Sequence, residues 1–141
     1  MKISFVAGFG PIVSTITDSL AFYRDALGIQ FEGDESYPHT DELNGVRAFA
    51  LWRLTDAAQS CFETVAWPAS LPVPQAWIEF DVASHEAVGE AAQELEGRGY
   101  RLVRQAKKEE WGQTVARLLS PEGLLVGIAH TPWMHKNSHP A

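Results

Sequence analysis

The sequence predicts an α+β fold of two tandem βαβββ modules, whose strands form one curved mixed sheet around a shared cleft. The first observation is that residues 18–28 and 84–99 each combine a polar capping residue, an apolar helical stripe and a terminal glycine. The second is that a strand-like run follows each of these helices. The third is a proline-rich connector, residues 67–74, near the midpoint of the chain. A single βα sandwich without internal symmetry is the alternative, and the position of the connector favours the repeat.

Length and composition indicate one domain over residues 1–141. Within it we expect module one at residues 6–66, module two at 75–132 and a loosely held polar tail at 133–141. The net charge of −7 argues against a nucleic-acid partner, because proteins that bind nucleic acid carry basic patches. No apolar run approaches the roughly 20 residues that span a bilayer, so no membrane partner is expected. The single cysteine, Cys61, fits a reducing, cytoplasmic location.

In module one, the stripe formed by Leu20, Tyr23 and Leu27 gives the helix at 18–28 its apolar face. The strands of this module are expected at residues 9–14, 29–32, 46–54 and 60–65. Pro11 has no N–H group for the sheet ladder, so it predicts an edge position or a bulge. The acidic, turn-forming stretch 34–45 is expected to be a loop.

In module two, residues 75–82 alternate cleanly, which is typical of a half-buried strand. One set of side chains is expected to face the helix: Ile78, Phe80 and Val82. The other set is expected to line the concave side of the sheet: Trp77, Glu79 and Asp81. The helix at 84–99 follows, and further strands are expected at 100–103, 113–119 and 124–129.

Two groups of residues resemble the vicinal oxygen chelate superfamily, which includes glyoxalase I, extradiol dioxygenases, and fosfomycin- and bleomycin-resistance proteins. They are residues 19–28 (SLAFYRDALG) in the first half, and Trp111–Gln113, Arg117 and 120–126 (SPEGLLV) in the second. The similarity extends over residues 6–132. It implies paired βαβββ modules around a shared cleft and a homodimer, but no single reaction, because this fold supports many.

Most enzymes of that superfamily hold a divalent metal through His and Glu on the first and last strands of each module. In this sequence the corresponding positions fall at Gly8, Trp77 and Gly127, none of which can ligate through its side chain. Only Glu63 could fill the fourth position, and one carboxylate does not make a site. The resemblance therefore predicts a protein without the usual metal and with no other cofactor. The histidines are expected to be solvated surface residues: His39, His85, His130, His135 and His139.

A tryptophan and carboxylates on the inner face of a sheet favour a flat or cationic ligand. For Trp77 two interpretations stay open, ligand contact and packing against the other module. For Glu79 we favour an ion pair with Arg117 or Arg47, because a buried carboxylate needs a partner. Trp111 is either at the edge of the cleft or in the core. The predicted ligand-binding residues, none of them catalytic, are Trp77, Glu79, Trp111, Phe49 and Arg117.

The predicted function is metal-independent binding of a small molecule, in analogy with resistance proteins that sequester an antibiotic. The acidic loop and the net charge would attract a cationic or aromatic ligand. A metal-dependent lyase, isomerase or dioxygenase with ligands at other positions is the enzyme alternative. A dimeric subunit that regulates a partner is the second alternative. Cys61 has no neighbouring base in the sequence, so a buried, inert thiol is expected rather than a nucleophile.

Overall fold

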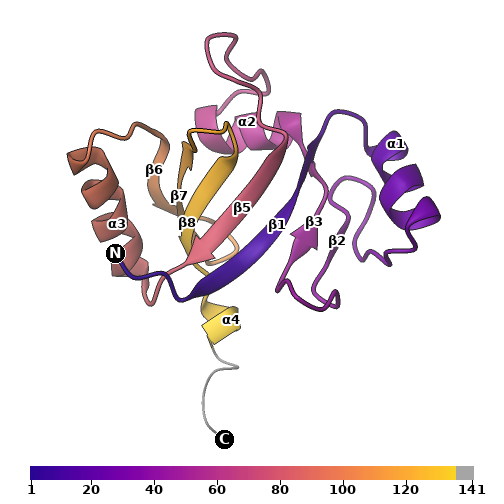
Figure 1. The fold of residues 1–141 in the computed structure, drawn as a ribbon, viewed down its shortest axis with the longest axis horizontal. Helices are drawn as coiled ribbons and strands as arrows, with labels where there is room; N and C mark the ends of the chain where they lie inside the picture. Colours follow the sequence, from indigo (N-terminus) through magenta and orange to yellow (C-terminus); the bar gives the residue numbers. More distant parts are fainter. Residues whose placement is uncertain (136–141) are drawn as a thin grey trace, which may run out of the picture.

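A curved, open sheet of eight strands forms the centre of the protein in the computed structural model, which describes residues 1–135 (Figure 1). The strands follow the order β2-β3-β1-β5-β8-β7-β6, and β4 pairs with β1 beyond the end of β3. The strands are β1 (Phe5–Val13), β2 (His39–Thr40), β3 (Phe49–Ala50), β4 (Trp52–Arg53), β5 (Ala76–Asp81), β6 (Leu102–Lys108), β7 (Thr114–Leu119) and β8 (Leu125–His130). The helices are α1 (Ile16–Leu20), which continues as the π-helix η1 (Ala21–Ala26), α2 (Leu54–Phe62), α3 (His85–Gly97) and α4 (Pro132–His135). The predicted fold class is confirmed.

Module two has the predicted order of elements, with α3 packed against β6, β7 and β8. The Ser84 hydroxyl accepts a hydrogen bond from the Ala87 amide at 3.1 Å, which caps the start of α3 as expected. Gly99 follows the helix with a φ of 93°, a conformation that glycine adopts without steric cost. The buried face of α3 joins the outward side chains of the sheet in one core cluster: Val82, Val88, Ala91, Ala92, Ala116 and Ile128. Phe80 also packs against this cluster, so Phe80 and Val82 face α3 as predicted.

The first predicted helix is also present, and it covers the opposite end of the sheet (Figure 1). Its N-cap position is Thr15, upstream of the capping residue expected at the start of 18–28, and the Thr15 side chain makes no capping hydrogen bond. Gly28 follows the end of the helix with a φ of 80°. Leu20 is buried against Val13, Phe49 and Leu51, so this helix closes a second core cluster.

The prediction of a strand at residues 60–65 is wrong, because this part of module one is occupied by the end of α2. The residues that α2 buries are Ala57, Ala58 and Cys61. Their spacing places them on one helical face, a periodicity that the apolar run before them obscured. Cys61 is buried as predicted.

Three other details of module one differ from expectation. Residues 29–32 form only an isolated bridge, between Glu32 and His39, and the strand predicted at 46–54 is broken into β3 and β4 by Leu51. Strand β1 is central rather than at an edge. The Phe9 amide donates to the Ala48 carbonyl, on the side of β1 that pairs with β3 and β4. Pro11 faces this same side, at the point where pairing passes from β3 to β4. Its missing N–H therefore costs no ladder bond.

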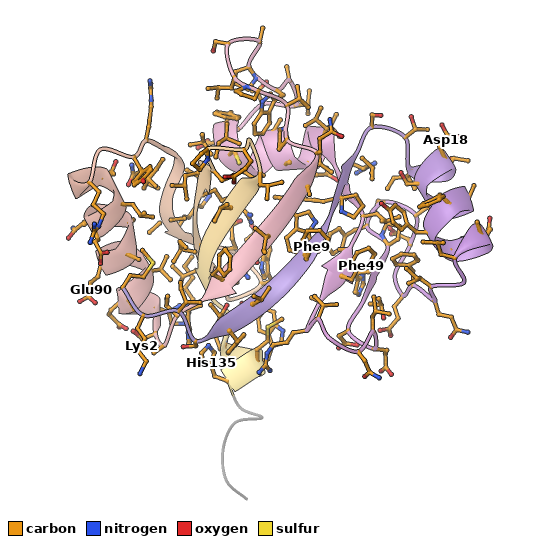
Figure 2. The ribbon with its side chains drawn as sticks, viewed as in Figure 1. Lys2, Phe9, Asp18, Phe49, Glu90 and His135 are labelled. Atoms are coloured by element: carbon orange, nitrogen blue, oxygen red, sulfur yellow. The ribbon has the colours of Figure 1, made fainter. Side chains whose placement is uncertain are left out.

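The start of the expected tail is structured, because Pro132–His135 forms α4 beneath the sheet (Figure 2). The remainder of that tail, with His139, lies outside the described residues. Within residues 1–135, no helix is both long enough and apolar enough to cross a membrane.

Candidate functional site

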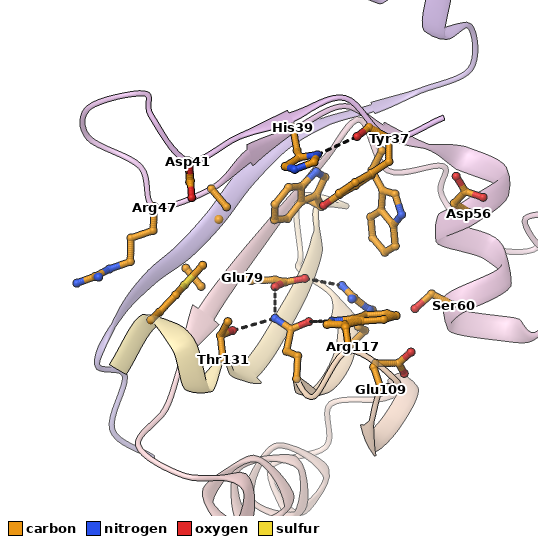
Figure 3. A pocket seen from close by; sticks show the side chains of 18 of the residues that line it. Tyr37, His39, Asp41, Arg47, Asp56, Ser60, Glu79, Glu109, Arg117 and Thr131 are labelled. Carbon is orange, nitrogen blue, oxygen red and sulfur yellow. Dashed lines mark hydrogen bonds and ion pairs between the residues drawn. The ribbon is translucent and has the colours of Figure 1, made fainter. Parts of the chain in front are cut away.

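A cavity of about 1120 Å³ opens on the side of the sheet opposite α3 (Figure 3). Both halves of the chain contribute to its wall, as expected for a cleft between two modules. The contributing elements are β1, β2, β4, α2, β5, β6, β7 and α4.

The floor of this cavity is a continuous hydrogen-bonded network centred on Glu79. The Arg117 Nη1 atom donates to Glu79 Oε2 at 3.1 Å, which confirms the predicted ion pair. Gln113 Nε2 donates to Glu79 Oε1 at 3.0 Å and to the Thr131 hydroxyl at 2.9 Å. Trp111 Nε1 donates to Gln113 Oε1 at 3.1 Å, so both the nitrogen and the oxygen of the Gln113 amide have protein partners. The network fixes the carboxylate and the guanidinium in one orientation.

Arg117 is held deeply in this floor, with only 4% of its side chain exposed. Its guanidinium carbon lies 4.7 Å from the centre of the Trp52 ring, within cation–π range. Its Nε atom is buried and has no hydrogen-bond partner among the described residues. Arg47, the other partner considered for Glu79, instead stacks on Phe5 at 4.0 Å.

The register of the sheet tests whether the superfamily metal fits this floor. Glu79 lies between Gly8 of β1 and Gly127 of β8, so these three residues form one row across the sheet. The expectation that Trp77 stands at the second-module metal position is therefore wrong by two residues, because Gly8 pairs with Glu79 and Gly10 pairs with Trp77. A Cβ on Gly8 would lie 2.7 Å from the Trp77 ring, and one on Gly127 would lie 2.8 Å from Glu79 Cγ. The only carboxylate of the row is already paired with the Arg117 cation. These residues do not fit a divalent metal, which needs several anionic or imidazole donors.

Glu63, the fourth candidate, lies on no strand. It ends α2 in the left-handed conformation, with a φ of 60°, and its exposed carboxylate pairs with Arg104 at 3.0 Å. Strands β3 and β4, rather than residue 63, run beside β1. Residues 48–53 of this segment contain no His, Cys, Asp or Glu.

The predicted binding residues divide into two groups. Trp77, Glu79, Trp111 and Arg117 all line the cavity, whereas Phe49 does not. Phe49 is buried near α1, where its ring packs against Phe9 as well as Tyr23 and Phe31 (Figure 2).

The tryptophans differ in exposure, which separates their roles. Trp77 is buried, its indole N–H donates to the Ala50 carbonyl at 3.2 Å, and its ring meets the Trp52 ring edge-on at a centroid distance of 6.3 Å. Trp77 therefore packs in the core and also forms part of the cavity wall. Trp111 lies at the rim and is 57% exposed.

Several residues that line the cavity are not predicted individually from the sequence. Tyr37 lies in the predicted acidic loop, and Trp133 and Met134 lie in the predicted tail. Gln113 was part of the superfamily resemblance only, and its spacing from Glu79 and Thr131 gives no local signal. These residues reach the site through tertiary packing alone.

Acidic groups outnumber basic ones around the cavity. The carboxylates are Glu32, Asp41, Asp56, Glu63, Glu79 and Glu109, and the basic residues are Arg47, Arg104, Lys107 and Arg117. Tyr37 is 44% exposed as a whole, yet desolvation by the surrounding protein, with a smaller effect of the Glu79 charge, raises its pKa to about 12. Its hydroxyl therefore ionises only at a higher pH than that of an ordinary tyrosine.

The expectation that all histidines are solvated is wrong for His130, which is buried at the end of β8. Its Nδ1 atom donates to the Val82 carbonyl at 2.8 Å. His85 and His135 pack against its ring at centroid distances of 4.7 and 4.4 Å. The apolar alternation of β8 concealed this position, because a buried histidine and a surface histidine look the same in sequence.

The sequence profile described as Glyoxalase/Bleomycin resistance protein/Dioxygenase superfamily matches residues 9–128. No curated protein matches the chain in sequence. A superfamily member from Vibrio splendidus 12B01 is 17% identical with a TM-score of 0.56, over 92% of this chain and 100% of that one. A structure from Legionella pneumophila, described as an NAD-dependent benzaldehyde dehydrogenase, is 17% identical with a TM-score of 0.57, over 87% and 96%.

A Streptomyces coelicolor methylmalonyl-CoA epimerase, in complex with 2-nitronate-propionyl-CoA, is also similar in structure. It is 14% identical with a TM-score of 0.53, over 93% of this chain and 99% of that one. At these identities the three structures establish a shared fold and nothing about the ligand.

Proposed function

The chain belongs to the glyoxalase/bleomycin resistance protein/dioxygenase superfamily, and we propose that it binds a small aromatic cation in the cavity and sequesters it without a metal. One observation carries this proposal: a Glu79–Arg117 ion pair occupies the floor, in the row of residues that Glu79 forms with Gly8 and Gly127 across the sheet. A pre-formed cavity with a few fixed polar groups is the usual form of a small-molecule site.

Exposed aromatic rings around the cavity support an aromatic ligand. Tyr37, Trp111 and Trp133 remain 44%, 57% and 46% exposed, although large aromatic side chains are usually more deeply buried. Each ring that stacks on a flat ligand would contribute about 0.5–1.5 kcal/mol beyond the burial of its area.

The charge of the cavity supports a cation. Carboxylates exceed basic groups along its wall, and the whole chain carries a net charge of −7. Tyrosine and tryptophan rings add cation–π attraction of about 0.5–2 kcal/mol. A cationic ligand would therefore gain from both the wall and the long-range field.

The enzyme alternative, a metal-dependent lyase, isomerase or dioxygenase, needs metal donors at other positions. Within the cavity floor each carboxylate or amide oxygen is already committed to a protein partner. We therefore retain binding, rather than catalysis, as the proposed function.

Calorimetry with two cationic probes tests the proposal, using bleomycin as a glycopeptide and ethidium as a flat aromatic cation. At least one probe should bind with a stoichiometry of one per chain, whereas the anionic dye anilinonaphthalene sulfonate should bind more weakly. Replacing Trp111 by alanine should weaken binding about 5–10-fold, corresponding to about 1–1.4 kcal/mol.

Tyr100→Ala is the matched control, because this exposed aromatic residue is not part of the cavity wall. Absence of binding for both cationic probes, or equal losses in the two variants, would contradict the proposal.

We also propose that the protein is a cytoplasmic homodimer. The β1 face turned away from the cavity exposes Val6 and Phe9, which offer an apolar surface to a second copy. Light scattering tests this assembly, and a monomer at micromolar concentration would refute it.

A further inference from the structure

We propose that Asp81, His130 and His135 form a second site, which binds one divalent transition metal ion beneath the cavity. One ligand atom from each of these residues lies within 4.8 Å of the other two. The site is separate from the superfamily metal position in the row of Gly8, Glu79 and Gly127, because it lies at the end of β5 and β8 next to α4.

His130 is held in the form that a metal ligand requires. Its Nδ1–H donates to the Val82 carbonyl at 2.8 Å, so in the neutral ring the lone pair that could bind a metal is on Nε2. A backbone carbonyl that accepts from the remote nitrogen is the usual second partner of a metal-binding histidine, and it fixes both the tautomer and the ring orientation.

Asp81 is fixed equally well and is completely buried. Its Oδ1 accepts the Thr131 hydroxyl at 2.9 Å and its Oδ2 accepts the Thr131 amide at 2.9 Å. A buried carboxylate requires a positive counter-charge, and a divalent ion supplies one.

His135 brings the third donor from α4. Its Nε2 lies 2.6 Å from Asp81 Oδ2, and an ion bound between these atoms would replace that contact with two metal–ligand bonds. The side chain is 24% exposed, which gives an ion access to the site from solvent. Figure 2 shows His135 on α4, below the strands that carry the other two ligands.

The distances need a local adjustment. In a tetrahedral site, ligand atoms about 2.1 Å from the ion lie about 3.4 Å apart, so separations of up to 4.8 Å would close by up to about 1.4 Å, and the 2.6 Å contact between His135 and Asp81 would open by about 0.8 Å. We assign most of this movement to His135, whose side chain is partly exposed. Two imidazoles and one carboxylate suit Zn²⁺, Co²⁺, Ni²⁺ or Fe²⁺, and they leave one coordination position open.

The site is linked to the cavity by the Thr131 hydroxyl, which donates to Asp81 and accepts from Gln113. It also holds α4, which carries Trp133 and Met134 to the cavity wall. A bound ion would therefore fix one wall of the cavity.

Titration of the full chain without an affinity tag, after treatment with EDTA, tests the proposal. Calorimetry with Zn²⁺ should give one ion per chain, and Co²⁺ should give the visible absorption of a low-symmetry nitrogen–oxygen site. His135→Gln should weaken Zn²⁺ binding at least 10-fold, as should His130→Gln, in which the amide can still donate to the Val82 carbonyl.

His39→Gln is the matched control, because His39 lies on β2 and outside the cluster, and it should bind Zn²⁺ as the unmodified chain does. His139→Gln tests whether a histidine of the C-terminal tail, rather than the cluster, binds the Zn²⁺ ion. Far-UV circular dichroism checks folding, and His135→Gln decides alone if the buried His130 variant is unfolded. No stoichiometric Zn²⁺ binding, binding unchanged in both cluster variants, or a loss confined to His39→Gln or His139→Gln would overturn the proposal.

Discussion

Replacing Glu79 by glutamine should destabilise the protein substantially, because it leaves the Arg117 cation buried without a counter-charge. Removing one partner of a buried ion pair costs about 3–5 kcal/mol. The Glu79 side chain is slightly exposed toward the cavity, and the glutamine can still accept a hydrogen bond from Arg117 or Gln113. We therefore expect a loss of about 2–3 kcal/mol in the free energy of unfolding, below the full range for a buried pair.

A double-mutant cycle separates the pair from its surroundings. Arg117→Met removes the cation but keeps an apolar side chain on Trp52, and it leaves Glu79 bonded to Gln113. The double variant should be less destabilised than the sum of the single variants, with a coupling energy of about 1–3 kcal/mol. Urea unfolding followed by far-UV circular dichroism measures all four free energies, provided that the urea dependence stays constant.

Asp56→Asn provides the matched control, because the Arg53–Asp56 pair has a similar distance of 2.8 Å but is well exposed. Its loss should cost about 0–1 kcal/mol. A cost for Glu79→Gln no larger than that of Asp56→Asn, or strict additivity in the cycle, would refute the assignment of a buried, mutually dependent pair.

Two further predictions concern the core around Trp77, which Gly8 approaches closely and in which Cys61 is buried. Gly8→Ala should lower the free energy of unfolding in urea by about 1–3 kcal/mol, because the added Cβ would meet the Trp77 ring at 2.7 Å. The control Gly89→Ala should stabilise α3 by up to about 1 kcal/mol, because its Cβ meets no atom within 4 Å. Equal effects of the two substitutions would show that the close approach at Gly8 is relieved at no cost. Burial raises the pKa of the Cys61 thiol from 9.0 to about 11, so alkylation by iodoacetamide at pH 8 should be about 100-fold slower in the folded than in the urea-unfolded chain, measured by mass spectrometry. The folded state binds the Cys61 proton more tightly than the unfolded state does, so the contribution of Cys61 to stability should decline as pH rises from about 9 to 11. Similar alkylation rates in the folded and unfolded chain would contradict the burial of the thiol.

Local signals explain which elements could be predicted from sequence. The Ser84 cap and the glycines after the two main helices act within a few residues, and they locate both helices. Helix α2 is not predicted from the sequence, because its short apolar stripe directly follows a strand-like run. Arg53 precedes the helix and makes no side-chain cap, so no capping residue marks its start.

The sequence alone determined the fold class, the inward face of β5 and the pairing of Glu79 with an arginine, because alternation and the cost of a buried charge are properties of the chain itself. Only the tertiary structure decided how the site is completed. Gln113 joins Glu79 across 34 residues, and His135 meets Asp81 across 54. Contacts at such separations depend on strand order and register, which local patterns do not encode. Glycine at residues 8 and 127 excludes their side chains as metal ligands, but the registers of β5 with β8 and of β8 with β7 place Arg117 beside the one remaining carboxylate.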